Sequence, residues 1–452
     1  MSDSCESSST IRVKLKNTSP SMEEQDKLHL VHARPVHLTE QASPFSKESH
    51  EENFRGFLNL AVLLLVVNML RLILENYQKY GFLLSIPFSQ LPLSDPIYLG
   101  LFIFCLALHI VAAVYVEKQL LLREQSCGSK AKCNDHLPII LIGSNLAAVL
   151  LLPSWIVCTR LYHPALGSLA LCISLILIMK LVSYHAVNKE LRSLYLANEK
   201  ETAYKSCSYP KNLSVGNFVY FWFAPTLCYQ PVYPRSGRFH KSFFLKRMVE
   251  FAAASAMVYI LIEQYTRPTV QNSIKPLNEL NAIGVIERIL KVSLSSLFIW
   301  LLGFYAFFHS FLNAIAELLC FGDRQFYRAW WNARGIDEYW RYWNIPVHLW
   351  LKRHVQQPLT SRFSPGTSQL IIFFLSAAAH EFLVAVPTGV FQGWAFIGML
   401  FQVPLITLTS WYMKQWPHSS AGNYLFWITF CILGQPMCIL LYYRAWINKT
   451  LL

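Results

Sequence analysis

Charged side chains are scarce in this sequence, because Asp, Glu, Lys and Arg make up only 14% of its 452 residues. A soluble domain carries about a quarter charged residues, so the composition excludes a soluble domain of this length. Hydrophobic residues make up 54% and aromatic residues 14%, and the mean hydropathy is +0.33. The composition therefore predicts an integral membrane protein.

Other common patterns are missing as well. The eleven cysteines include no CxxC pair and no metal-ligand spacing, so we expect no metal site. No stretch shows the alternation of about ten residues that marks a transmembrane β-strand, which leaves helices as the spanning elements. The first fifty residues are too polar for a signal peptide, so we expect the first apolar span to direct targeting.

Apolar segments of membrane-spanning length occur along most of the chain. Residues 1–52 are rich in Ser, Glu, Lys and His, and we expect them to form a disordered cytosolic tail. Residues 53–452 form the predicted transmembrane domain, an all-α polytopic fold of about nine spanning helices. The predicted spans are 57–75, 97–116, 138–158, 165–184, 250–265, 291–319, 369–387, 394–412 and 424–443.

Lysine and arginine are concentrated in alternate loops, which predicts the orientation of the chain. The positive-inside rule assigns the basic loops to the cytosol. The N-terminus is then cytosolic and the C-terminus lumenal. The basic loops are 117–137, 185–249 and 320–368, and the charge-poor loops are 77–96, 159–164, 266–290 and 388–393.

The net charge of +13 favours anionic partners, either lipid headgroups or a phosphorylated ligand. Nucleic acid is not expected, because the basic residues lie in loops between apolar spans and not on one soluble face. Glycosylation sequons occur at Asn17, Asn212 and Asn448. The orientation places the first two in the cytosol and the third beside the membrane, so we expect no glycan on any of them.

The apolar segment from Ile371 to Pro387 holds two ionisable residues near its middle, His380 and Glu381. A charged side chain at mid-membrane costs about 2.5–3.5 kcal/mol on insertion scales, so such residues usually face a protein interior or a cavity and mark a function. His109 and His309 also lie in apolar spans, but neither has an adjacent carboxylate. The pair at 380 and 381 is therefore the better candidate for a functional site.

The loop from Phe321 to Val355 is rich in tryptophan and arginine. Its helical spacing predicts an amphipathic cytosolic helix, which Pro346 interrupts. One interpretation makes its aromatic residues membrane-interface anchors. The other makes the loop a mouth for an anionic, partly planar ligand, in which Arg and Lys bind phosphate and Trp side chains stack. The tryptophans are Trp330, Trp331, Trp340, Trp343 and Trp350.

The segments FYRAWWN and YWRYWNIPVHLW, followed by an intramembrane HE, resemble the membrane-bound O-acyltransferase family. Within that family the sequence is most similar to the diacylglycerol type of the diacylglycerol and sterol O-acyltransferase branch. Further resembling stretches include PTVQNSIKPL and WAFIGMLFQVP, and the likeness extends from about Phe54 to near Tyr443. The resemblance implies an endoplasmic-reticulum enzyme that transfers a fatty acyl group from acyl-CoA to diacylglycerol and makes triacylglycerol. It implies no cofactor, since acyl-CoA is a co-substrate, and a homodimer or tetramer.

The resemblance also implies roles for individual residues. His380 matches the catalytic histidine of the family, and Asn344 matches the asparagine of its WNIPVH element. His348 matches a residue near the coenzyme A end of the family's tunnel. The residues that match the lining of the reaction chamber are Ser376, Glu381, Met399, Gln402 and Gln435.

Acyl transfer to an alcohol needs a base for the hydroxyl proton and a donor for the developing oxyanion. A neutral His380 imidazole can be the base at pH 7. Ser376 lies one turn before it on the same helical face, whereas Glu381 points about 100° away, toward the acceptor or a neighbouring helix. The Asn344 amide is a candidate oxyanion donor, as is His348. The alternative for Asn344 is a helix cap.

Two other groups keep a structural alternative. Gln402 and Gln435 lie in apolar spans, where an amide also serves to hold helices together. Arg353 and Lys352 can meet either the phosphates of coenzyme A or lipid headgroups.

One residue departs from the family pattern: Ala329 stands where the motif usually has Asp. We expect that Asp to have had a structural role, with a local cost of about 0.5–2 kcal/mol for its loss. A sterol O-acyltransferase, a proton-relay transporter and a catalytically silent scaffold remain alternative functions. The sequence shows no internal repeat of the kind found in many transporters.

Overall fold

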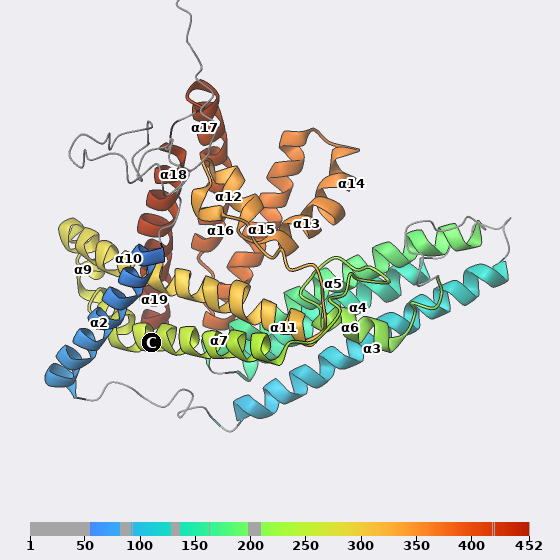
Figure 1. Ribbon diagram of the computed structural model, residues 1–452, viewed down its shortest axis with the longest axis horizontal. Helices are drawn as coiled ribbons and strands as arrows, with labels where there is room; N and C mark the ends of the chain where they lie inside the picture. Colours follow the sequence, from blue (N-terminus) through green and yellow to red (C-terminus); the bar gives the residue numbers. More distant parts are fainter. Residues whose placement is uncertain are drawn as a thin grey trace, which may run out of the picture. The chain divides into compact units, whose positions relative to one another are not determined.

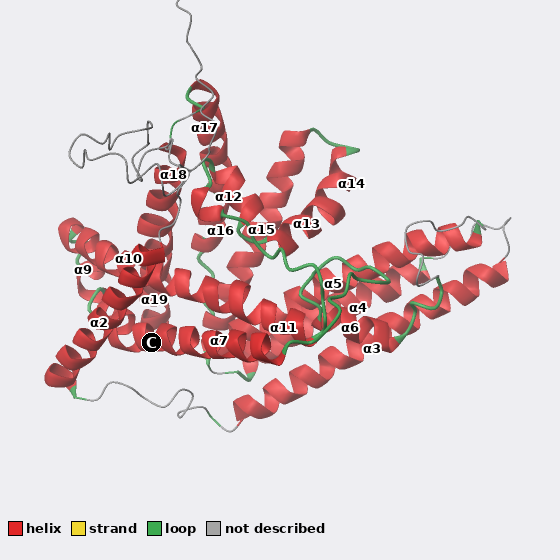
Figure 2. Cartoon of the chain, viewed as in Figure 1, coloured by secondary structure: helices red, strands yellow, loops and turns green. Residues whose placement is uncertain are grey.

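The computed structural model describes residues 55–81, 92, 94–127, 136–161, 163–197, 209–417, 419 and 421–451. The predicted tail at 1–52 lies outside these residues. The described part of the chain is helical, with no strand beyond an isolated bridge between Arg235 and Phe321 (Figure 2). The chain divides into two compact units, 1–68 and 69–452, and the candidate site residues all belong to the second unit. The predicted all-α fold is confirmed.

The helices follow one another along the chain in the order shown in Figure 1. The first half contains α2 (Arg55–Tyr80), α3 (Ser94–Cys127), α4 (Leu137–Thr159), α5 (Pro164–Leu196), α6 (Val215–Phe223), α7 (Lys241–Leu261), η1 (Ile262–Thr266), α8 (Arg267–Gln271) and α9 (Ile274–Asn278). The middle contains α10 (Ala282–Phe304), η2 (Tyr305–Phe311), α11 (Leu312–Leu318), η3 (Trp330–Asn332), α12 (Ile336–Tyr342), α13 (Ile345–Leu351), η4 (Lys352–Gln356) and α14 (Gln357–Thr360). The last part contains α15 (Pro365–Thr388), α16 (Trp394–Leu400), α17 (Gln402–Gln415), α18 (Ala421–Phe426), η5 (Trp427–Gly434) and α19 (Gln435–Leu451).

Seven helical segments of the described residues have the length and hydropathy needed to cross a membrane. The segments predicted at 57–75 and 250–265 fall in α2 and α7, which are helical but are not among the seven. The charged residues Lys246, Arg247 and Glu250 within α7 lower its hydropathy. The polytopic architecture is confirmed, and the count of nine spans stays a prediction.

Helices α3 and α5 continue well beyond the predicted spans 97–116 and 165–184. At 33 residues, α5 is about 50 Å long, whereas the hydrocarbon core of a bilayer is about 30 Å thick. The sequence assigned these extensions to loops because they carry charges. The structure shows instead that both helices continue, and that Glu117 and Glu124 of one extension pair with side chains of the other.

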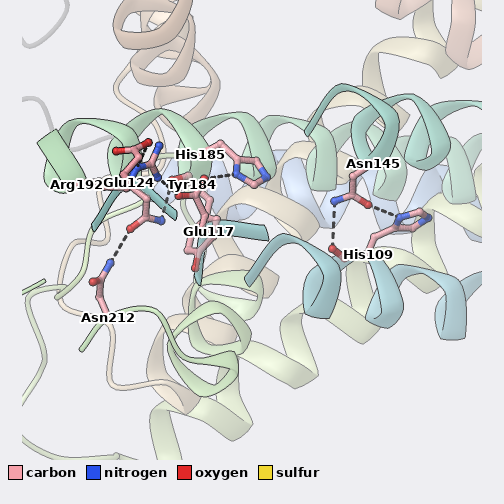
Figure 3. Close-up of polar contacts among 9 residues, drawn as sticks. His109, Glu117, Glu124, Asn145, Tyr184, His185, Arg192 and Asn212 are labelled. Carbon is pink, nitrogen blue, oxygen red and sulfur yellow. Dashed lines mark hydrogen bonds and ion pairs between the residues drawn. The ribbon is translucent and has the colours of Figure 1, made fainter. Parts of the chain in front are cut away.

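Figure 3 shows this buried network between α3 and α5. Glu117 accepts hydrogen bonds from His185 Nδ1 and Arg192 Nη1, both at 2.6 Å, and its side chain is about 1% exposed. Arg192 Nε donates to Glu124 at 2.9 Å. One carboxylate with two donors satisfies a charge that would be costly to bury alone. The network therefore holds α3 against α5.

A second polar pair in Figure 3 joins α3 to α4. His109 Nδ1 lies 2.7 Å from Asn145 Oδ1, and Asn145 Nδ2 donates to the carbonyl of His109. His109 is therefore a helix-packing residue, as the sequence allowed. Together with the apolar core that these helices share, the pair joins α3, α4 and α5 into one block.

The segment after α5 is anchored to that helix by buried polar contacts. Asn212 is 1% exposed, and its Nδ2 donates to Asn188 Oδ1 and to the hydroxyl of Tyr229. An amide nitrogen in this position cannot carry a glycan in the folded protein, which agrees with the expectation for this sequon. Lys180 Nζ donates to the carbonyls of Phe221, Trp222 and Ala224, and so caps the C-terminus of α6.

Candidate active site

Helix α15 carries the ionisable pair, and its ends are well defined by the sequence. Ser364 is the N-cap, with its hydroxyl accepting from the amide of Thr367, and Pro365 occupies the first helical position. Gly389 ends the helix in a left-handed conformation, with φ of 64°. The helix contacts α4, α5, α16 and α17, so it has neighbours on several sides.

His380 is held in one tautomer by its own helix. Its Nδ1 lies 2.7 Å from the carbonyl oxygen of Ser376. A carbonyl can only accept, so Nδ1 carries the proton and Nε2 keeps a free lone pair. The side chain is exposed, and Nε2 forms no hydrogen bond with the described residues. The imidazole is therefore prepared to accept a proton at Nε2, as a general base must be.

Glu381 points away from His380 and binds the next element of the chain. Its Oε1 accepts from the amide of Gly393 at 2.9 Å, and its Oε2 accepts from the amide of Phe396 at 3.1 Å. The hydroxyl of Tyr442 donates to Oε2 at 2.5 Å. The carboxylate thus holds the start of α16 and ties both α15 and α16 to α19. This is the neighbouring-helix contact that the sequence allowed, and a substrate contact for Glu381 stays a prediction.

The other residues expected to line the reaction chamber lie on helices that follow α15 in the chain. Met399 on α16 and Gln402 at the start of α17 are both 8% exposed, and Gln402 Nε2 donates to the carbonyl of Gly398. Gln435 begins α19, and its Oε1 is buried without a partner among the described residues. An unsatisfied buried amide oxygen is costly, so it is a natural acceptor for a ligand hydroxyl.

The aromatic loop is folded into the protein with its inner face buried. Trp330, Ile336 and Tyr339 are 1% exposed or less, and they pack against Leu405 and Phe426 of the C-terminal helices. Trp330 and Tyr339 are therefore core residues, whereas Trp331 is 45% exposed. The interpretation as an interface anchor fits only the outer face of this loop.

Asn344 is the N-cap of α13, and its Oδ1 accepts from the amide of Val347 at 3.2 Å. This is the structural alternative that the sequence raised. None of the described residues contacts Nδ2, so the amide can still donate to an oxyanion. Asn344 thus combines a cap at one atom with a free donor at the other.

Trp343 and Trp350 position the segment around Asn344. The ring of Trp343 contacts Trp300 at 5.3 Å and Phe308 at 5.4 Å between centroids. Trp350 Nε1 donates to the carbonyl of Met179 on α5 at 2.7 Å. The segment is therefore joined both to α10 and to α5.

Several cations surround the same segment. Burial lowers the pKa of His348, and Lys352, Arg341 and Arg328 lower it further. Burial and Arg353 lower the pKa of His354 to about 4. Lys352 and Arg353 form no ion pair with the described residues, and η4, which carries both, contacts α5 and α15. Positive charge thus lies beside the helix that holds His380.

Ala329 occupies the N-cap position of η3, and no side chain caps that turn. An Asp at this position can accept a hydrogen bond from the exposed amides of the turn. The structure therefore agrees with a capping role for the residue that Ala329 replaces.

Two side-chain contacts near the candidate site had no signal in the sequence. Tyr442 lies 61 residues from Glu381 in an ordinary apolar stretch, and only the fold brings them together. His309 contacts Arg247, and its Nδ1 lies 2.6 Å from the hydroxyl of Tyr327 in the FYRAWWN segment. His309 is therefore a partner of the aromatic loop and not a free base.

Comparison with known proteins shows the family of this chain. The profile of the membrane-bound O-acyltransferase family matches residues 122–443. Diacylglycerol O-acyltransferase 1-2 of Oryza sativa subsp. japonica is 40% identical over 424 residues, covering 92% of this chain and 86% of the relative. Diacylglycerol O-acyltransferase 1C of Glycine max is 40% identical and diacylglycerol O-acyltransferase 1 of Dictyostelium discoideum 36%; they cover 92% and 91% of this chain, and 80% and 66% of their own lengths. The chain belongs to the membrane-bound O-acyltransferase family.

Proposed function

We propose that the protein is an acyl-CoA:diacylglycerol O-acyltransferase, which makes triacylglycerol from fatty acyl-CoA and diacylglycerol. The observation that carries this proposal is the tautomer of His380. Its Nδ1 is engaged by the Ser376 carbonyl, which leaves Nε2 as a base on an apolar helix where a lipid alcohol can reach it. The choice of diacylglycerol as the acceptor substrate rests on the relatives, each of which is named a diacylglycerol O-acyltransferase.

The reaction needs one base and no cofactor. The free hydroxyl of diacylglycerol attacks the thioester carbonyl carbon as its proton passes to Nε2 of His380. Nδ2 of Asn344 and the imidazole of His348 are the proposed donors to the oxyanion. The carbon–sulfur bond then breaks, and the proton on Nε2 neutralises the coenzyme A thiolate.

The two substrates are proposed to reach His380 from different sides. Arg353 and Trp343 would bind acyl-CoA on the cytosolic face, in line with the unpaired cations near α13. Diacylglycerol would enter sideways from the membrane and meet Ser376, Glu381, Met399, Gln402 and Gln435. A chamber with little water also limits hydrolysis of the thioester.

The location of the protein is part of the same proposal. The endoplasmic-reticulum membrane is what the family resemblance implies. The basic loops support a cytosolic N-terminus and a lumenal C-terminus. We also propose a homodimer or tetramer, as the family resemblance implies.

One assay tests the function. Microsomes that contain the protein receive labelled acyl-CoA together with diacylglycerol, cholesterol or a long-chain alcohol. We expect labelled triacylglycerol, abolished by His380→Ala and retained by His109→Gln, whose histidine packs two helices. If sterol ester is the main product, the acceptor is a sterol and not diacylglycerol. If no acceptor gives a product, the protein is a catalytically silent scaffold.

A further inference from the structure

A polar pocket lies at the other end of the span that precedes the aromatic loop. It has a volume of about 580 Å³ and is lined mainly by the segment QNSIKPLNE and by Arg288 of α10. The continuous helix from Ala282 to Leu318 has 37 residues, or about 55 Å, which exceeds the thickness of the bilayer core. The pocket lies at the start of this helix and the aromatic loop follows its end, so the pocket is no part of the proposed acyl-CoA site.

Two cations, Lys275 and Arg288, and one carboxylate, Glu279, line the pocket, and neither cation forms a salt bridge with the described residues. Arg288 Nε is buried without a hydrogen-bond partner among these residues. Asn278 also lines the pocket; its Oδ1 accepts from Arg444 Nε at 2.9 Å, which leaves its Nδ2 as a donor. Two cations and an amide donor facing one cavity form a site for an oxyanion with several acceptor oxygens.

The position of the pocket along the membrane-spanning helix indicates which kind of anion it binds. Ile286 and Leu290, which flank Arg288 along α10, are 58% and 54% exposed, and Ile283 is 83% exposed. They form an apolar stripe on another side of α10, and the exposed ion pair of Glu287 and Lys291 lies beside it. Apolar and charged side chains exposed at one level of a helix are typical of the layer where the lipid phase meets its headgroups. Anions at the boundary of that phase are lipid headgroups and not free solutes.

We propose that this pocket binds the phosphate of a membrane glycerophospholipid, with Lys275 and Arg288 as its ligands. Asn278 adds a hydrogen bond to the phosphate, and Glu279, on the same wall, faces the polar part of the headgroup. The volume falls within the range of about 300–1,000 Å³ that is usual for small-ligand pockets. The pocket floor rests on the apolar contacts of Val270, Leu277, Ile289 and Leu440, so a bound lipid would brace α10 against α19.

Native mass spectrometry of the purified full chain in micelles tests the proposal, with phosphatidylglycerol as the probe. We expect Arg288→Gln and Lys275→Gln each to weaken binding about tenfold, and Arg288→Lys to restore most of it. Lys291→Gln is the matched control, because Lys291 lies one turn further along α10 and pairs with Glu287 at 2.5 Å. Diacylglycerol, which has the tails without the phosphate, should bind the variants and the parent equally.

Three outcomes would overturn the proposal. If phosphatidylglycerol binds both pocket variants as tightly as the parent, the pocket is not its binding site. If Lys291→Gln weakens binding as much as the pocket variants do, the lipid responds to the overall positive charge of this region and not to the pocket. Inorganic phosphate that competes as well as the lipid would assign the pocket to a soluble anion. Lys275 is exposed, so its variant folds even where Arg288→Gln does not. Acyl transfer by Lys275→Gln without added phospholipid should match the parent, which separates this site from the proposed reaction.

Discussion

The hydroxyl of Tyr442 lies 2.5 Å from Oε2 of Glu381 and joins the last helix to the helix that carries the proposed base. Because the same carboxylate also accepts from the amides of Gly393 and Phe396, it fixes the start of α16. Glu381 is thus a positioning residue in this structure.

Tyr442→Phe removes one hydrogen bond to a charged acceptor, and we expect it to lower the free energy of unfolding by about 1.5–3 kcal/mol. The turnover number should fall while the Michaelis constant for diacylglycerol stays near the parent value. Thermal midpoint and initial rates measure the two effects. Tyr424→Phe is the control, because Tyr424 is 68% exposed. A raised Michaelis constant with an unchanged midpoint would make Tyr442 a substrate contact instead.

Ser376→Ala should keep the turnover number within about threefold of the parent, because His380 is oriented by the backbone carbonyl at 376 and not by the hydroxyl. Initial rates with diacylglycerol are the measurement. A loss of a hundredfold or more would show that the hydroxyl itself contacts a reacting group.

Asn344→Asp separates the two tasks of Asn344. The aspartate keeps the oxygen that caps α13 but replaces the amide donor by a second oxygen. We expect a near-parent thermal midpoint and a turnover number lower by about 10²–10³, the usual cost of one oxyanion donor. Asn344→Ala should lose both the helix cap and the amide donor, so its thermal midpoint and its turnover number should both fall. Full activity in the aspartate variant would leave the cap as the only role.

Ala329→Asp should raise the free energy of unfolding by about 0.5–1 kcal/mol, because it supplies the missing cap of η3. The Michaelis constant for acyl-CoA should not change. A steep fall in that constant would mean that the carboxylate serves substrate binding. Gln325→Asp offers an exposed control in the same loop.

Acidification should destabilise the protein through His354. Its pKa is about 4 in the folded chain and 6.5 for the unperturbed group, so between these values the unfolded chain binds more protons. Stability is therefore lost as the pH falls from 6.5 to 4, by on the order of 1–2 kcal/mol once the full effect is reduced for solvent screening of this half-buried side chain. Thermal midpoints measured across this range should fall less steeply for His354→Gln. An identical slope in the variant would assign the effect to other groups.

Hydropathy predicted that the chain is a membrane protein and located most of the spanning helices, because a long apolar segment is sufficient to identify such a helix. It could not predict that α3 and α5 continue as helices, since Glu117, Glu124 and Arg192 read as loop charges until they are paired. Nor could it predict whether α7 crosses the membrane, because four charged residues lie within that helix.

The candidate site was predictable only in part. The spacing of Ser376 and His380 on one face follows from helical geometry. The carbonyl contact that selects the tautomer, and the contact between Glu381 and Tyr442, depend on three-dimensional packing. Single-sequence periodicity carries no information about either contact.

The hydrogen bond from Trp350 to the carbonyl of Met179 has a mechanical consequence. Any movement of α13 away from α5 must either break that bond or carry α5 with it. Because buried polar contacts tie α5 to α3, and a polar pair ties α3 to α4, such a movement would displace several helices against the surrounding lipid. If acyl-CoA enters beside α13 as proposed, its binding rate should therefore depend on the thickness and stiffness of the bilayer.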